Sequence, residues 1–150
     1  MGLYPRQFYR YFLSILLKLD RVPAVVSSGE RISRFIFYQR HIKGGEIRAA
    51  AFLPSRTSED TSVYRTDGCS EKKVWLLGNL FVERLRRDGR TVLARGDVIS
   101  GTVFGQDLKI ISTPRPHPRH AVICNWPDDK PQQLIKAMAL ALKATLHLNQ

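Results

Sequence analysis

Short strand-like runs bounded by turn residues recur through most of this chain, and they restrict its fold more than any other feature. Two longer stretches with helical periodicity interrupt them, at residues 70–85 and 132–146. Strands and helices in this order predict a single α+β domain, with a mostly antiparallel sheet packed by two or three helices. The predicted strands lie at residues 47–53, 61–66, 91–95, 98–104, 108–111 and 121–124.

The clearest predicted helix begins after Ser70, which is a favourable N-cap residue, with Glu71 in the first turn. The second helix is expected to close the chain. The apolar spacing predicts one buried face on each helix. In the first helix this face comprises Val74, Trp75, Leu77, Leu80, Phe81 and Leu85, and in the second it comprises Leu134, Ile135, Met138, Leu142 and Leu146.

Residues 28–38 permit two interpretations. Ser27 and Glu30 have the spacing of a capping box, and apolar residues follow at helical intervals, so we expect a short helix here. The run at residues 35–38 also suits a strand. Further along, the turn at residues 105–107 predicts a hairpin between residues 98–104 and 108–111. Three prolines predict an extended loop over residues 113–120.

The chain has 150 residues, which suits one domain over residues 25–150, preceded by an amphipathic helix and linker at residues 1–24. This helix, which has one basic side, could dock on the core, on a partner protein through residues 4–20, or on an anionic membrane. Its apolar run is too short to span a bilayer, and Cys69 and Cys124 set no disulfide framework. We therefore expect a cytoplasmic protein with reduced thiols.

The net charge of +11 and the sequence pI of about 10.2 are the outliers of the composition. Such an excess attracts polyanions, and 16 of the 24 basic residues are arginines, whose planar forks match phosphate geometry. A GC-rich genome would also enrich arginine. The charge nonetheless predicts nucleic acid as the partner.

The candidate nucleic-acid or anion ligands come from two regions and from several strand ends. One region is the arginine-rich end of the first predicted helix, and the other is the loop-rich stretch between Pro114 and Pro131, where binding groups commonly lie. Trp126 could stack on a base or pack on the core. The predicted ligands are Arg65, Arg84, Arg87, Arg90, Arg95, Arg115, Arg119, His120 and Trp126.

Strong catalytic motifs are absent from the sequence, but four strand ends or loops carry suitable groups for phosphodiester chemistry. The candidates for catalysis are His41, Arg65, Asp97 and His120. The alternative is that these are rim charges and that Asp97 pairs with Arg95. The spacing of His117, His120 and Cys124 is an incomplete ligand set for a metal, so we predict neither a metal nor a cofactor.

From about residue 27 onward, several short motifs resemble a group of small bacterial proteins without an assigned activity. The motifs are Ala51-Phe52-Leu53-Pro54, Ser62-Val63-Tyr64-Arg65-Thr66, Val74-Trp75 with Gly78, Arg95-Gly96-Asp97, and Arg119-His120-Ala121-Val122-Ile123 followed by Trp126-Pro127. The resemblance covers roughly four-fifths of the chain. It implies a bacterial accessory-gene setting and carries over no catalytic role.

These observations support three hypotheses. The first is a non-enzymatic accessory module that binds the phosphate backbone of nucleic acid. The second is a small metal-independent enzyme on a phosphate-containing substrate, with His41 or His120 as acid or base and Arg65, Arg95 or Arg119 as anion clamps. The third is a subunit of a larger complex that docks through its N-terminal helix.

Overall fold

A six-stranded antiparallel sheet organises the computed structural model, which describes residues 22–115 and 117–150. The strand order is β6-β7-β4-β1-β5-β8, so each neighbour pair runs antiparallel, and the predicted α+β class is confirmed. A small hairpin joins β2 (Ile42–Lys43) to β3 (Glu46–Ile47). The strands of the sheet are β1 (Arg31–Ile36), β4 (Thr61–Arg65), β5 (Ala94–Ile99), β6 (Lys109–Ser112), β7 (His120–Cys124) and β8 (Thr145–Leu148).

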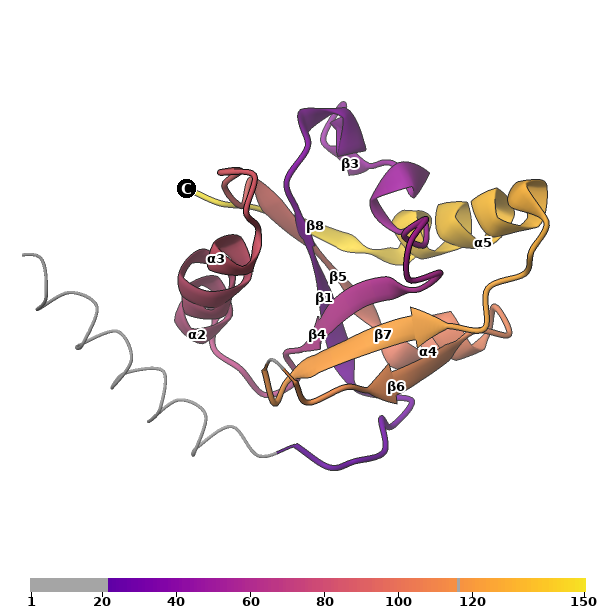
Figure 1. Cartoon of the computed structure of the whole chain (residues 1–150), viewed down its shortest axis with the longest axis horizontal. Coiled ribbons are helices and arrows are strands. Elements are labelled where there is room, and N and C mark those ends of the chain that lie inside the picture. Colours follow the sequence, from indigo (N-terminus) through magenta and orange to yellow (C-terminus); the bar gives the residue numbers. More distant parts are fainter. Residues whose placement is uncertain (1–21, 116) are drawn as a thin grey trace, which may run out of the picture.

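Helices cover both faces of the sheet (Figure 1). One face carries a continuous helical segment with a π-helical turn in its middle. The other face carries the long C-terminal helix and the shorter helical elements. The first segment consists of α2 (Glu71–Leu76), η3 (Leu77–Val82) and α3 (Glu83–Leu85); the remaining elements are η1 (Gln39–His41), η2 (Ala49–Ala51), α4 (Ser100–Phe104) and α5 (Lys130–Lys143).

The central strand β1 divides the interior into two cores. Ile32 and Ile36 project into the larger core, which is completed by α5 and η2. Phe35 projects to the opposite face and packs with Tyr64 and the α2–α3 segment. Because β1 is buried on both sides, its apolar residues do not alternate with polar ones.

The prediction of a helix over residues 28–38 was wrong for this reason, and the alternative strand is what forms. The local pairing of Ser27 and Glu30 does exist: the Ser27 N–H donates to Glu30 Oε2 at 3.3 Å, and the Glu30 N–H donates to the Ser27 carbonyl at 3.2 Å. These bonds close a turn that leads into a strand. Residues 47–53 also differ from the predicted strand, since most of them form η2 and the turn after it.

The predicted helix after Ser70 is confirmed, including its cap, because Ser70 Oγ accepts from the Lys73 N–H at 3.2 Å. Its π-helical turn contains Gly78, which lies against the ring of Phe35. A Cβ atom at Gly78 would lie 2.5 Å from Phe35 Cε1, so this close approach requires glycine. Leu85, expected to be buried, is exposed at the end of the segment.

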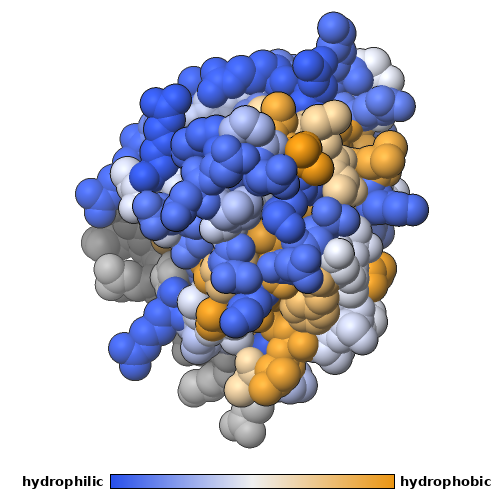
Figure 2. Space-filling model, turned by 90° about the vertical axis from the view of Figure 1, so that its right-hand side faces the viewer, coloured by the Kyte–Doolittle hydropathy of each residue, from blue (hydrophilic) through white to orange (hydrophobic). Residues whose placement is uncertain are grey.

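The closing helix α5 buries a different face from the one predicted. Ala137, Leu140 and Ala141 are buried, and the small alanines allow the helix to lie close to the sheet. Figure 2 views the molecule from the right-hand side of Figure 1, and apolar side chains gather on the outer surface that it shows. The residues predicted to face inward are mostly exposed: Leu134, Ile135, Met138 and Leu142.

Two connections also differ from the prediction. The strand β5 ends at Ile99 and α4 begins at Ser100, so residues 98–104 form no hairpin with residues 108–111. Instead β6 pairs with β7, so that β6 is an edge strand of the sheet and residues 113–119 join the two strands. The predicted helix over residues 132–146 ends at Lys143, and the chain continues as the edge strand β8.

The predicted N-terminal amphipathic helix falls mostly on residues 1–21, outside the described part of the chain. Within the described ranges, no helix combines the length and the apolar character needed to cross a membrane.

Candidate nucleic-acid interface

Three arginine side chains gather around the ring of Tyr38, and we call Tyr38, Arg40, Arg86 and Arg90 the arginine–tyrosine cluster. The Cζ atoms of Arg40 and Arg90 each lie 4.4 Å from the centroid of the Tyr38 ring, and that of Arg86 lies 5.5 Å away. Arg86 also stacks on Phe37, with its Cζ 4.3 Å from that ring. Such contacts fix guanidinium groups that would otherwise be free to rotate.

Two parts of the chain build the cluster. Tyr38 follows β1 and Arg40 lies in η1, whereas Arg86 and Arg90 flank the turn after α3. The turn is closed by Asp88, which accepts from the Arg86 Nη2 at 2.8 Å and from the Arg90 N–H at 3.1 Å. Arg86 Nη2 also donates to Tyr38 Oη at 3.1 Å, which joins the two parts.

The cluster carries a surplus of positive charge, since three guanidinium groups accompany the carboxylate of Asp88. The hydrogen bond from Arg86 holds the pKa of Asp88 below its usual value, so this carboxylate is ionised at neutral pH. The His41 ring lies 5.2 Å from Tyr38. Burial lowers the pKa of His41, and the charges of Arg40 and Arg34 lower it further, which reflects the positive potential here.

A shallow groove of about 480 Å³ runs along this surface. Arg40 and Arg90 line it and are both exposed. Stacking leaves the N–H edges of a guanidinium free to donate, and these edges form two parallel hydrogen bonds with a phosphate group. The other lining residues are Phe37, Tyr38, Gln39, Gly89, Thr91 and Leu93.

Three arginines predicted to bind anions lie instead in the interior. The Arg65 side chain is fully buried, and its Nη2 donates to Glu30 Oε2 at 3.0 Å. Arg119 is 9% exposed and donates from Nη1 to the Arg65 carbonyl at 2.9 Å. The Arg95 side chain is also fully buried and pairs with Asp97 and Glu71. Burial keeps these groups from a phosphate backbone.

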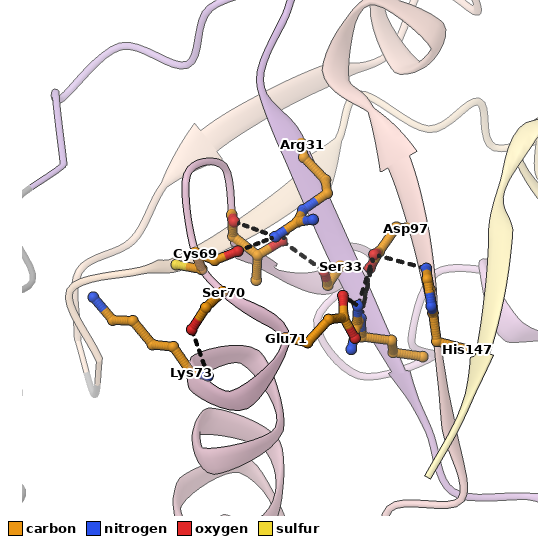
Figure 3. Close-up of polar contacts among 10 residues, drawn as sticks. Arg31, Ser33, Cys69, Ser70, Glu71, Lys73, Asp97 and His147 are labelled. Carbon is orange, nitrogen blue, oxygen red and sulfur yellow. Dashed lines mark hydrogen bonds and ion pairs between the residues drawn. The ribbon is translucent and has the colours of Figure 1, made fainter.

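Arg95 pairs with Asp97 and Glu71 in a polar network that holds α2 to the sheet, and Figure 3 labels both carboxylates. Asp97 accepts from Ser33 Oγ at 2.6 Å and from Arg95 Nε at 3.0 Å, and its Oδ2 lies 3.3 Å from His147 Nε2. Arg31 Nη2 donates to the Cys69 carbonyl at 3.0 Å, just before the first turn of α2. The alternative interpretation of Asp97, as a partner of Arg95, is therefore confirmed.

The four candidate catalytic residues do not meet in one place. The His41 ring lies tilted against the Tyr38 ring, Arg65 lies beside Arg119, and Asp97 lies beside Arg95. His120 contacts Ser62 and Thr113, and its ring makes an edge contact with Tyr64. The proposed anion clamps Arg65, Arg95 and Arg119 are instead engaged in interior contacts with Glu30, Asp97, Glu71 and the Arg65 carbonyl.

The other predicted ligands are divided between the surface and the core. Arg84, Arg87 and Arg115 are exposed. Trp126 packs on the larger core, and its Nε1 donates to the Ile123 carbonyl at 3.1 Å. Its ring is therefore part of the packing and not a platform for a base. Arg90 is the one predicted ligand that lies in the arginine–tyrosine cluster.

Sequence reasoning missed Tyr38, Arg40 and Arg86 as site residues. The available signal was an aromatic residue at a strand end with arginine two positions later, together with the arginine run at residues 84–90. Contact between these segments depends on tertiary structure, because β1 ends at Ile36 and α3 begins only at Glu83.

No family model, curated protein or solved structure matches this chain. Among residues 22–115 and 117–150, there is no group of three or more His, Cys, Asp or Glu side chains arranged to hold a metal ion. Cys69 and Cys124 are free thiols.

Proposed function

We propose that this protein is a basic accessory module that binds the phosphate backbone of nucleic acid through the arginine–tyrosine cluster. The observation that carries the proposal is the stacking of Arg40 and Arg90 on one tyrosine ring at an exposed groove. Guanidinium groups held in this way lose less conformational freedom when they bind phosphate.

The net charge of +11 supports the same proposal, because it raises the local concentration of a polyanion around the whole protein. Exposed Arg84 and Arg87 lie on and next to α3, beside the cluster, and extend the positive surface. The Tyr38 ring is occupied by arginines, so the cluster favours phosphate contacts over base stacking. The proposed binding is therefore weakly dependent on sequence.

Purification in high salt, with nuclease treatment, followed by binding to labelled single-stranded RNA, single-stranded DNA and duplex DNA, tests the proposal. Binding should weaken steeply as the salt concentration rises, because each phosphate contact releases counterions. Binding that does not depend on salt, or none to any of the three probes, would reject it.

A further inference from the structure

A cavity of about 190 Å³ lies beside the arginine–tyrosine cluster, under the α3 end of the helical segment. It shares Arg86 with the cluster but opens onto different residues. Its polar lining comes from β1, β4, β7 and the end of α3, and comprises Arg34, Ser62, Tyr64, Arg86 and His120. Phe35, Phe37, Val82 and Leu85 complete the walls.

Arg34 is a cation without a carboxylate partner within the described ranges. Its Nε donates to the Ala51 carbonyl at 2.8 Å and its Nη1 to the Ser62 carbonyl at 2.9 Å, where β1 and β4 separate. Burial lowers the pKa of Arg34 to about 10, and the nearby charge of Arg86 contributes, yet the group stays protonated at neutral pH. A partly buried charge of this kind is stabilised by an anion.

Arg86 is the second guanidinium group in the cavity lining. Its Nη2 is used by Tyr38 and Asp88, whereas its Nε is buried and has no acceptor among residues 22–115 and 117–150. Leaving a buried N–H unpaired costs free energy. Two guanidinium groups therefore line one small cavity, and no carboxylate stands among the residues that line it.

Ser62 and His120 form a hydrogen-bonded pair in the same wall. Ser62 Oγ lies 2.5 Å from His120 Nε2, and His120 Nδ1 lies 2.6 Å from Thr113 Oγ1 and 3.3 Å from the Thr113 carbonyl. The carbonyl favours a proton on Nδ1, so Nε2 accepts from the serine hydroxyl. A protonated His120 would reverse this bond and free the hydroxyl to donate into the cavity.

We infer that this cavity binds a phosphate monoester, with Arg34 and Arg86 holding its oxygens and Ser62 donating a further hydrogen bond once His120 takes up a proton beside the bound anion. The ligand is either the terminal phosphate of a nucleic-acid strand or that of a small phosphorylated molecule. The inference goes beyond backbone binding and does not require it, because Arg40 and Arg90 lie outside the cavity lining.

Inorganic phosphate is the first probe, titrated against chloride at matched ionic strength while the ring resonances of His120 are followed by NMR. We expect a saturable shift of these resonances in the natural protein. Ser62→Ala should weaken the apparent affinity several-fold, and Arg34→Gln should abolish the shift. The control Arg56→Gln removes an exposed charge at another surface and should change nothing.

Absence of a saturable shift in the natural protein would overturn the inference. An undiminished phosphate response in Ser62→Ala would do the same, even if Arg34→Gln fails to fold. The double variant Arg40→Gln/Arg90→Gln separates this site from the backbone interface: it should bind strands more weakly and keep the phosphate response.

Two further arms identify the source of the phosphate. Preference for oligonucleotides with a terminal phosphate over the same strands ending in hydroxyl groups supports a strand end. Equal binding of those strands, together with tight binding of a free nucleoside monophosphate, supports a small phosphorylated molecule. Failure of both probes to displace inorganic phosphate would overturn the assignment of a monoester.

Discussion

Arg95 and Asp97 stand two residues apart on β5 and form a buried ion pair, with Arg95 Nε 3.0 Å from Asp97 Oδ1. Residues at this spacing project to the same face of a sheet. Asp97 also accepts from Ser33 on β1 and contacts His147 on β8, while Arg95 reaches Glu71 in the first turn of α2. The pair therefore ties three strands and one helix together.

Replacing Asp97 by Ala should destabilise the fold by about 3–5 kcal/mol, because it leaves a buried guanidinium without its main partner. Glu71→Gln is the matched control. The Glu71 side chain is 59% exposed and Arg95 keeps Asp97, so this change should cost less than about 1 kcal/mol. Urea denaturation measures the free energy of unfolding of both variants. Equal losses would contradict the prediction that the buried Arg95–Asp97 pair contributes more than the exposed Arg95–Glu71 contact.

Stability should fall on mild acidification because His120 is held neutral. Burial lowers the pKa of His120 below its ordinary value of 6.5. A depressed histidine pKa means that the unfolded state binds the proton more readily, so this contribution to stability is complete above pH 6.5 and declines as the pH falls through the lower, folded-state pKa.

The variant His120→Gln tests this pH dependence, since glutamine can still bond to Ser62 but does not titrate. The free energy of unfolding should change less between pH 7.5 and pH 5 in the variant than in the natural protein. Identical pH profiles would assign the acid sensitivity to other groups, such as His41, whose pKa burial also lowers.

Gly78→Ala should destabilise the protein by about 1–3 kcal/mol through overpacking. The added methyl group would lie 2.5 Å from Phe35 Cε1 in the smaller core. Combining it with Phe35→Leu should recover part of the loss, because the smaller side chain makes room. Thermal unfolding of the two single variants and the double variant measures the coupling, and strictly additive losses would contradict the contact.

The buried face of α5 can be tested with two leucines on one helix. Leu140 is 0% exposed and Leu142 is 83% exposed. Leu140→Ala should cost about 2–5 kcal/mol, whereas Leu142→Ala should fall within about 0.5 kcal/mol of the natural protein. Chemical denaturation of the two variants measures their free energies of unfolding and shows which leucine is buried. The reverse order would restore the face predicted from apolar spacing.

Much of the fold follows from local signals in the sequence. The strands predicted at residues 61–66 and 121–124 form as β4 and β7 with bounds shifted by one residue, and the predicted capped helix after Ser70 also forms. Errors arose where both sides of an element are buried or where burial depends on small residues. The inner strand β1 mimics helical spacing, and α5 buries alanines while its larger apolar residues stay exposed.

The candidate site was less predictable, because an arginine in the sequence does not reveal whether its partner is a carboxylate or a ligand. Arg65 and Arg95 lie in strands and are neutralised by Glu30 and Asp97. Arg90 was predicted as a ligand and lies at the surface of the cluster. Its neighbour Tyr38 is brought to it only by tertiary packing.

The central claim is that Arg40 and Arg90 contact the phosphate backbone, and the salt dependence of binding tests it most directly. The double variant Arg40→Gln/Arg90→Gln should bind labelled single-stranded nucleic acid more weakly than the natural protein. Its slope of log affinity against log salt should fall by about 1.4, since two phosphate contacts are lost. Arg56→Gln/Lys130→Gln removes the same charge from exposed positions outside the cluster and should keep most of the natural slope. If both double variants lose affinity and slope equally, the positive charge acts as a whole and the cluster is not the interface.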